Sequence, residues 1–585
     1  MATPNLSIRS LLTLLGLLTA SGVSYGQNYE RYKPLSVPHE RFDNQQSLQS
    51  EALSPVEGDD STLVDRLEGV IVLDSANKVE VENAHEGEVG INYDFEDTSS
   101  LVYGPAAQQI IDRYIGGPIT LRRLNQLSRD LILLYRRSGQ PVVDVAIPEQ
   151  KVTAGVVQVV VTEARIGRVT ISDGCYFSAE KMQRWVSCTR RGDRIYENKL
   201  NNDLFWLNQN PFRSVTVDLL PGATKGTTDV AFKVNDVLPW RTYAGYEDTG
   251  VQSLGLNRLY TGFIYGNAFG SGGTLSYQYT ADADFRRLHA HAVNFVQPIN
   301  RRWSWNSYGS WARVSPDLGA FSQNGESWQA GLGLTKHLHK SRWRDTNISA
   351  GFDFKQTNNN LEFGGQSVQA SAADLVQLRL SLFHLRRYCN DEYFFVFSDN
   401  FIGPGDGFTS DHNDAAFNTI RANTSTDYFY TRLRSERAWK PWAGWMSVGR
   451  FSGQLTTDRL LFSETLGLGG FDTIRGYDQR TLNGDAGWLA SWELGPDLYR
   501  FGSCHRASTV RAFGFVDMGN AHILDPVPGE EANQFLISTG VGARLTLSHH
   551  TSLRIGYGYG FEDIAGSSNR QRIHIGLVSQ FGKRP

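Results

Sequence analysis

Apolar and polar residues alternate with a period of two over most of the second half of the chain. In the segment 535–547 the apolar positions fall on every second residue, and small or polar residues stand between them. The segments 553–561 and 573–581 repeat this pattern. Such alternation is typical of β-strands with one apolar and one polar face. The chain from 238 to 581 is therefore predicted to be a series of antiparallel strands.

The length of these strands favours a transmembrane β-barrel over a soluble sandwich. Strands with an apolar outer face and a polar inner face suit a barrel in lipid, whereas a sandwich points its apolar faces inward. At roughly 20 residues per strand and connection, the segment 238–581 corresponds to about 16 strands, an even number as bacterial barrels have. The tryptophans expected at the membrane interfaces are Trp303, Trp305, Trp311, Trp439, Trp442 and Trp445. A large soluble all-β protein is the alternative that composition alone leaves open.

The first 26 residues form a predicted signal peptide. Arg9 precedes a short leucine-rich stretch, and small residues around Ser24 and Gly26 supply a cleavage site. The apolar stretch is too short for a membrane anchor. Residues 27–60 are polar and contain three prolines, so they suit a disordered linker, although residues 41–53 have weak helical character.

Residues 61–236 contain a strand–helix–helix–strand–strand order that occurs twice. In 61–165 the helix 121–137 places four leucines on one face at helical spacing, and strands are expected at 142–147 and 156–162. In 166–236 the second helix is expected at 197–208. Two small α/β modules follow from this repeat, and one irregular α+β domain is the alternative.

Composition limits the class of function. The net charge is −4 among 585 residues, which gives no basic surface for nucleic acid. An exported chain with four cysteines is able to form disulfides. Cys175 and Cys188 lie close enough in sequence to pair, which would contribute about 3 kcal/mol in the chain-entropy model. Whether Cys389 pairs with Cys504 is left open.

One loop and one strand carry the candidate chemistry. The glycine-rich segment 469–477 contains Arg475, and Asp517 lies further on in a predicted strand. A guanidinium binds a carboxylate through two parallel hydrogen bonds, which lysine cannot form. The other residues of the two motifs are Gly469, Gly470, Ile474, Gly476 and Tyr477 in the loop, and Phe515 and Gly519 in the strand. The alternative is an exposed loop arginine and an unrelated strand aspartate.

Together these motifs resemble the two-partner secretion transporters of the ShlB/FhaC/HecB type. These are outer-membrane barrels with polypeptide-transport-associated (POTRA) modules in the periplasm. The segments 117–120, 146–150 and 207–213 also resemble the family, although Gln140 replaces the usual aromatic residue. The resemblance implies two POTRA modules, 61–165 and 166–236, before a barrel at 238–581, with a plug helix and linker in 27–60. It also implies that the long loop folds into the barrel and that Arg475 pairs with Asp517 on the inner wall.

The resemblance implies a pore that secretes one large haemolysin- or adhesin-like partner, bound in extended form by the POTRA modules, and activates it in some members. It further implies contact with outer-membrane lipid, contact with the assembly machinery during biogenesis, and a monomeric state. An assembly or insertion factor of the same superfamily is the nearest alternative, and a passive porin or adhesin is the second. The second module, with its strand 215–220 and helix 197–208, is the expected contact for the partner.

No enzymatic motif stands out in the sequence, and we expect no cofactor, no metal site and no nucleic-acid partner. The Asp411–Asp414 segment resembles a metal ligand set but lies beside a glycine-rich stretch typical of a solvated loop. Three charged residues are expected to face the lumen beside the ion pair, namely Glu493, Arg432 and Arg434. Ordinary solvated lumen residues are the alternative interpretation of the two arginines.

Overall fold

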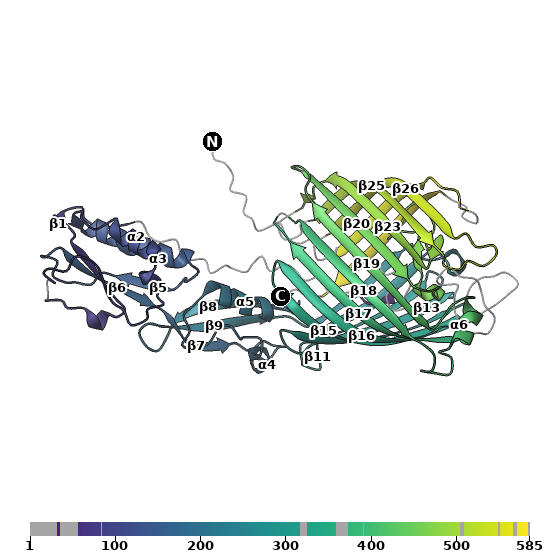
Figure 1. Cartoon of the computed structure of the whole chain (residues 1–585), viewed down its shortest axis with the longest axis horizontal. Helices are drawn as coiled ribbons and strands as arrows, with labels where there is room; N and C mark the ends of the chain where they lie inside the picture. The colour runs from purple at the N-terminus through teal and green to yellow at the C-terminus, as the bar shows by residue number, and fades with distance from the viewer. Residues whose placement is uncertain are drawn as a thin grey trace.

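The computed structural model describes residues 32–35, 56–82, 85–315, 325–357, 372–389, 391–502, 508–547, 550–564 and 570–582. The predicted signal peptide and most of the segment 27–60 lie outside these described residues. Figure 1 shows two small α/β modules lying end to end on one side of a large barrel. Among the helices of the described residues, none is both long and apolar enough to cross a membrane.

The first module is a four-stranded sheet in the order β3-β2-β6-β5, covered by two helices. Its longest helix spans the predicted range, because Thr120 accepts a hydrogen bond from Arg123 N at the start and the leucine face packs on the sheet. β3, which the sequence did not predict, pairs in parallel with β2. The elements are β1 (Thr62–Val64), β2 (Gly69–Leu73), β3 (Gly90–Asp94), α2 (Pro105–Asp112), β4 (Ile119–Thr120), α3 (Leu121–Arg137), β5 (Val143–Ala146) and β6 (Val156–Glu163).

The second module repeats the strand–helix–helix–strand–strand order in a three-stranded sheet, β7-β9-β8. Its core contains the stacked rings of Trp185 and Trp206, whose centroids are 6.0 Å apart. β8 pairs only with β9 among the described strands, so its other edge has no strand partner there. The elements are β7 (Arg165–Ile171), α4 (Ala179–Gln183), α5 (Glu197–Leu207), β8 (Arg213–Pro221) and β9 (Thr227–Asp236).

The segment between α5 and β8 attaches the second module to the barrel. Asn210 donates a hydrogen bond to the Gly266 carbonyl oxygen at the end of β11, and Asn267 Nδ2 donates one to Tyr176 O over 2.8 Å. The buried ring of Phe212 lies where a Gly266 side chain would be, so only glycine fits there. In the next turn of the barrel, Arg301 pairs with the buried carboxylate of Asp203. The family-like segment 207–213 is thus a joint between module and barrel.

Sixteen long antiparallel strands of the described residues close into the barrel, as predicted. β10 pairs with β28 and completes the ring. They are β10 (Trp240–Glu247), β11 (Arg258–Ala268), β12 (Gly273–Asp282), β13 (Leu288–Pro298), β14 (Trp303–Val314), β15 (Gly325–Lys340), β16 (Arg344–Thr357), β17 (Ala373–Arg387), β18 (Tyr393–Pro404), β19 (Asp427–Trp439), β20 (Trp445–Thr456), β23 (Ala486–Pro496), β25 (Ser508–His522), β26 (Asn533–Leu547), β27 (Thr551–Gly560) and β28 (Gln571–Phe581).

Short elements occupy the connections of the barrel. β24 (Tyr499–Phe501) extends the sheet beside β25 at the module end. α6 (Asp414–Ile420) lies at the end of the barrel opposite the modules (Figure 1). The long connection between β20 and β23 contains a 3-10 helix, η6 (Phe462–Glu464), and a small hairpin of β21 (Leu466–Leu468) and β22 (Leu482–Gly484). The described residues also contain the 3-10 helices η2 (Ala76–Lys78), η3 (Leu101–Tyr103) and η4 (Gln252–Leu254).

The alternating pattern of the strands corresponds to the two faces of the barrel. Val541 and Ile573 are each 62% exposed on the outer face, whereas charged residues on the same or neighbouring strands, such as Asp517, are fully buried. An apolar band outside and a polar interior are what a barrel in lipid requires.

The predicted disulfide between Cys175 and Cys188 is wrong, because both thiols are free. The two cysteines are held by separate anchors on either side of α4. Asp236 accepts a hydrogen bond from Cys175 N over 3.0 Å, and Asp203 accepts one from Cys188 N over 3.1 Å. Proximity in sequence was the only basis for the prediction. Cys389 is also free, and Cys504 lies outside the described residues.

Candidate functional site in the barrel lumen

The connection 457–485, called the lumen loop here, folds back inside the barrel. Ile474 and Tyr477 near its tip are 0% and 1% exposed, although they belong to a connection between strands. The β21–β22 hairpin forms the stem of the tip. Beyond β21 the backbone turns at Gly469 and Gly470, with φ of 103° and 112°, values that favour glycine. The two loop glycines identified in the sequence therefore shape the turn that carries Arg475.

The structure brings Arg475 and Asp517 together in the geometry that a guanidinium and a carboxylate prefer. Arg475 Nε donates to Asp517 Oδ2 and Nη2 donates to Oδ1, each over 2.7 Å. The Arg475 backbone N–H also donates to Oδ2, over 3.1 Å. The guanidinium lies 3.5 Å above the centre of the Phe515 ring, which adds a cation–π contact. Both charged side chains are buried, so each depends on the other for compensation.

Glu493 joins this pair to two further arginines of the barrel wall. Its carboxylate accepts hydrogen bonds from Arg475 Nη1 over 2.8 Å and from Arg544 Nη1 over 2.8 Å. Arg450 Nη1 lies 2.9 Å from the same carboxylate. Glu493 is fully buried on β23, so three guanidiniums surround a carboxylate that has no contact with solvent. We call Arg475, Asp517, Glu493, Arg450 and Arg544 the tip cluster.

Glycines on the barrel wall let the loop backbone approach closely. A Cβ atom on Gly558 of β27 would lie 2.5 Å from Gly476 N and 2.6 Å from Arg475 C. A Cβ atom on Gly519 of β25 would lie 2.6 Å from Trp488 O and 3.2 Å from Ile474 Cδ1. Gly476 itself has φ of 105°. Gly476 of the loop motif and Gly519 of the strand motif are therefore explained by the contact between the loop tip and the wall.

Other residues of the tip reach the strands near the closure of the barrel. Phe471 stacks on His574 of β28 with ring centroids 5.3 Å apart, and Asp472 lies 3.3 Å from Arg554 of β27. Tyr477 donates from its hydroxyl to the Ile537 carbonyl oxygen over 3.1 Å. The tip thus contacts several adjacent strands and covers one side of the lumen.

Arg432 and Arg434 both point inward from β19, and neither belongs to the tip cluster. Arg432 Nη2 donates to the backbone oxygen of Glu464 over 2.7 Å. Arg434 Nη2 lies 3.3 Å from Asp399 Oδ2. Since a carboxylate residue lies beside each arginine, this part of the wall carries both charges.

The sequence interpretation did not single out Arg450 or Arg544. Both lie at inward-facing positions of strands whose apolar and polar residues alternate. A charged residue at such a position was the sequence signal that could have identified them as lumen residues. The sequence could not indicate that both side chains meet Glu493, because the three residues lie on different strands.

The described part of the segment 27–60 includes residues 32–35, which lie inside the barrel. Tyr32 is 1% exposed and packs against inward-facing residues, among them Leu288 and Val314. Leu35 N donates to the hydroxyl of Tyr243 on β10 over 3.1 Å. These four residues therefore occupy lumen space next to the wall of the first strands.

Comparison with known families assigns both parts of the chain. The family model described as haemolysin secretion/activation protein ShlB/FhaC/HecB matches residues 226–545. The model for the ShlB-type POTRA domain matches residues 92–164. The first match covers more than half of the chain and includes the lumen loop.

Curated relatives and solved structures agree with these matches. The outer membrane transporter CdiB of Dickeya dadantii is 24% identical over 65% of this chain and 69% of its own length. The hemolysin transporter protein ShlB of Serratia marcescens is 22% identical over 74% of this chain and 75% of its own length. The structure of CdiB from Escherichia coli aligns with a TM-score of 0.60 at 17% identity over 92% of this chain and 95% of that chain. BamA from Haemophilus ducreyi, lacking its first three POTRA domains, aligns with a TM-score of 0.55 at 13% identity over 83% of this chain and 98% of that chain, which is a likeness of fold alone.

A sixteen-stranded barrel preceded by POTRA modules defines the class of POTRA-bearing outer-membrane barrel proteins. The chain belongs to the ShlB/FhaC/HecB family of haemolysin secretion/activation proteins, the transporters of two-partner secretion. Its barrel lies in the bacterial outer membrane and its POTRA modules lie in the periplasm. The end of the barrel that carries α6 is therefore extracellular.

Proposed function

We propose that this chain exports one large partner protein, received in extended form by the POTRA modules and passed through the barrel lumen. The proposal is supported by the family and by one observation above all, the lumen loop fixed to the inner wall by the tip cluster. A passive pore has no need for a long loop with a buried arginine at its tip. A transporter that must stay closed between substrates does need a movable obstruction.

The second module supplies a surface that suits an extended chain. β8 is an edge strand of its sheet, and an edge strand binds a passing segment through main-chain hydrogen bonds with little demand on sequence. Thr216 and Leu220 of this strand are exposed. The attachment of the module through Phe212 and Asn210 keeps this edge close to the barrel.

The described residues 32–35 add a second obstruction to the proposed resting state. Tyr32 is buried against the wall of β13 and β14, away from the strands that hold Arg475. We propose that residues 32–35 occupy the lumen at rest and leave it when the partner enters. Activation of the partner during export is part of the same proposal and rests on the family alone.

The function is tested in cells that produce the chain together with the product of its neighbouring reading frame. That frame is expected to encode a very large exported protein with a repetitive, β-rich sequence. The partner should accumulate in the culture supernatant only when this chain is present. Deletion of residues 166–236 should abolish its export while the barrel still assembles in the outer membrane. Unchanged export after this deletion would refute the role of the second module.

A further inference from the structure

A second group of buried ion pairs holds the lumen loop at the extracellular mouth of the barrel. Arg421, directly after α6, donates from Nη1 to Asp485 Oδ1 over 2.6 Å and from Nη2 to Oδ2 over 3.2 Å. Asp485 is the last residue of the lumen loop. Its carboxylate also accepts hydrogen bonds from the backbone N–H groups of Leu460 and Leu524, each over 3.0 Å. One carboxylate thus connects three extracellular connections.

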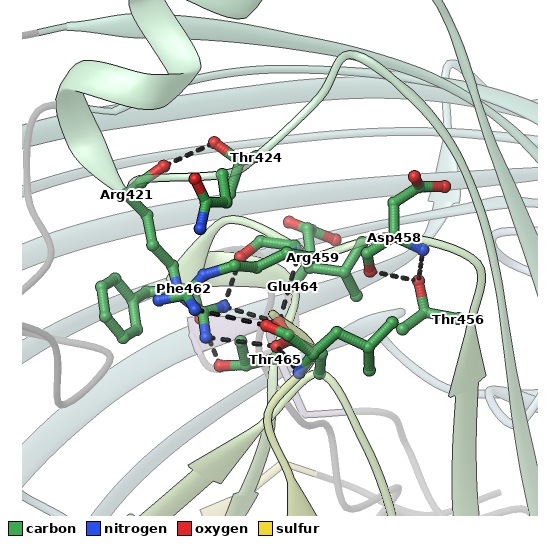
Figure 2. A network of polar contacts seen from close by, with 12 residues as sticks. Arg421, Thr424, Thr456, Asp458, Arg459, Phe462, Glu464 and Thr465 are labelled. Atoms are coloured by element: carbon green, nitrogen blue, oxygen red, sulfur yellow. Dashed lines mark hydrogen bonds and ion pairs between the residues drawn. The ribbon is translucent and has the colours of Figure 1, made fainter. Parts of the chain in front are cut away.

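Arg459, at the start of the lumen loop, makes the corresponding contact to the connection between β25 and β26. Its Nη2 donates to Glu530 Oε1 over 2.7 Å, and its Nη1 donates to the Asp525 carbonyl oxygen over 2.7 Å. Burial acts to raise the pKa of Glu530, but the hydrogen bond from Val527 and the Arg459 guanidinium lower it below the usual range. Glu530 is therefore ionised. Figure 2 shows Arg421, Arg459, Phe462 and Glu464 gathered in this region.

Apolar packing supports the same contacts. Phe417 and Ile420 of α6 pack against Leu460 and Leu461 of the lumen loop. The Arg421 guanidinium lies 4.7 Å from the centre of the Phe462 ring. The connection that carries α6 is itself well fixed, because Asp414 accepts a hydrogen bond from Thr426 N over 2.7 Å. α6 is thus a rigid support for the base of the loop.

The base of the lumen loop is also attached to the barrel wall. Glu464 in η6 accepts a hydrogen bond from Lys355 Nζ of β16 and another from the hydroxyl of Tyr430 of β19, each over 2.6 Å. These strands differ from β20, β23, β25 and β26, which carry the wall residues of the tip cluster. The loop is therefore attached to the wall through different residues at its base and at its tip.

We propose that Arg421, Asp485, Arg459 and Glu530, called the mouth cluster, are positioning residues that hold the base of the lumen loop independently of the tip cluster. The two clusters share no residue. The loop then clears the lumen only when both clusters have been released. This inference rests on the proposed function, because it gives the loop a role in closing the export path.

The test measures the chemical exposure of two buried loop residues in the purified full-length protein. The four native cysteines are replaced by serine, and a single cysteine is introduced as Ser463→Cys at the base or as Thr473→Cys at the tip. Ser463 and Thr473 are 5% and 4% exposed, so a maleimide should react slowly with either cysteine in the unaltered loop. The altered proteins carry Asp485→Asn, Asp517→Asn or both, changes that remove charge with little change of shape.

Asp485→Asn should raise the labelling rate at position 463 about tenfold and leave position 473 nearly unchanged, because opening is local. Asp517→Asn should raise the labelling rate at position 473 and leave the rate at position 463 nearly unchanged. The double variant should raise both rates and give a larger single-channel conductance in planar bilayers than either single variant. Equal effects of Asp485→Asn on both positions, or no effect at position 463, would overturn the inference.

Two controls keep the result interpretable. Arg421→Met preserves the apolar stem of the side chain and should reproduce the effect of Asp485→Asn if either variant is poorly produced. Lys440→Gln breaks an ion pair with Asp497 at a periplasmic turn, outside both clusters, and should change neither rate. Labelling needs no partner protein, so a failed labelling result together with normal export rejects the mouth cluster alone. The expected labelling rates together with an absence of export would reject the proposed export function and leave the mouth cluster intact.

Discussion

At the scale of single residues, the position of Arg475 depends on shape as much as on charge. Its guanidinium satisfies Asp517 and Glu493 at once while it rests on Phe515. A lysine would lose the forked geometry that makes these contacts simultaneous. The backbone of Arg475 and Gly476 lies close against β27, where Gly558 has no side chain. The position of Arg475 therefore depends on the charges of Asp517 and Glu493, on the ring of Phe515 and on the absence of a side chain at Gly558.

The role of wall glycines predicts different outcomes for two alanine substitutions on one strand. Gly558→Ala places a methyl group against the loop backbone, and such overpacking costs about 1–3 kcal/mol, so labelling of Thr473→Cys should rise about tenfold. Gly556→Ala is the matched control, since a Cβ atom there meets nothing within 4 Å. If both substitutions have the same effect on labelling, close approach of the loop is not what the glycine permits.

At the scale of elements, the buried side chain of Arg194 links the two POTRA modules. Arg194 of the second module lies 2.6 Å from Glu163 Oε2 and 2.7 Å from Asp97 Oδ2 of the first. Burial acts to lower the pKa of Arg194, but the carboxylates of Glu163 and Asp97 raise it above its usual value. The charged guanidinium thus links the modules, together with the Arg165–Asp97 ion pair and the hydrogen bond from Glu197 N to Gly139 O.

Arg194→Ala should widen the range of inter-module distances. It leaves Glu163 buried beside Tyr135 without a cation, which costs about 3 kcal/mol for an uncompensated buried charge. Spin labels at Gln126→Cys and Lys225→Cys of the full-length protein, with native cysteines replaced, would report the distance distribution. Arg168→Ala, an exposed arginine of the same module, should leave it narrow. An unchanged distribution in Arg194→Ala would show that the modules are held by other contacts.

Local patterns predicted the elements well because their signals are local. The leucine spacing of α3 and the alternation of β26 to β28 each require only neighbouring residues. The sequence did not predict β3, whose short polar stretch becomes a strand only because β2 pairs with it. The Arg475–Asp517 contact was anticipated from a family motif, whereas Arg450, Arg544 and the mouth cluster were not. Their partners come from strands or connections far apart in sequence, and the barrel closure alone brings them together.

At the scale of the whole molecule, the modules lie at one end of a barrel whose lumen is partly filled by segments of the same chain. The modules lead to one end of the barrel, residues 32–35 and the lumen loop occupy its interior, and α6 supports the loop at the other end (Figure 1). Buried ion pairs suit the attachment of the lumen loop, because separating the two partners inside the protein leaves each charge uncompensated and is costly in free energy. The central claim is that export depends on the loop being placed by Arg475.

The most direct test of this claim is the amount of partner protein in the culture supernatant of cells that produce Arg475→Ala. The control is an equal amount of folded, heat-modifiable barrel in the outer membrane. The substitution leaves the buried carboxylate of Asp517 without its cation, so we expect export to fall at least about tenfold. Export at the level of the unaltered protein, with the barrel equally abundant, would contradict the account.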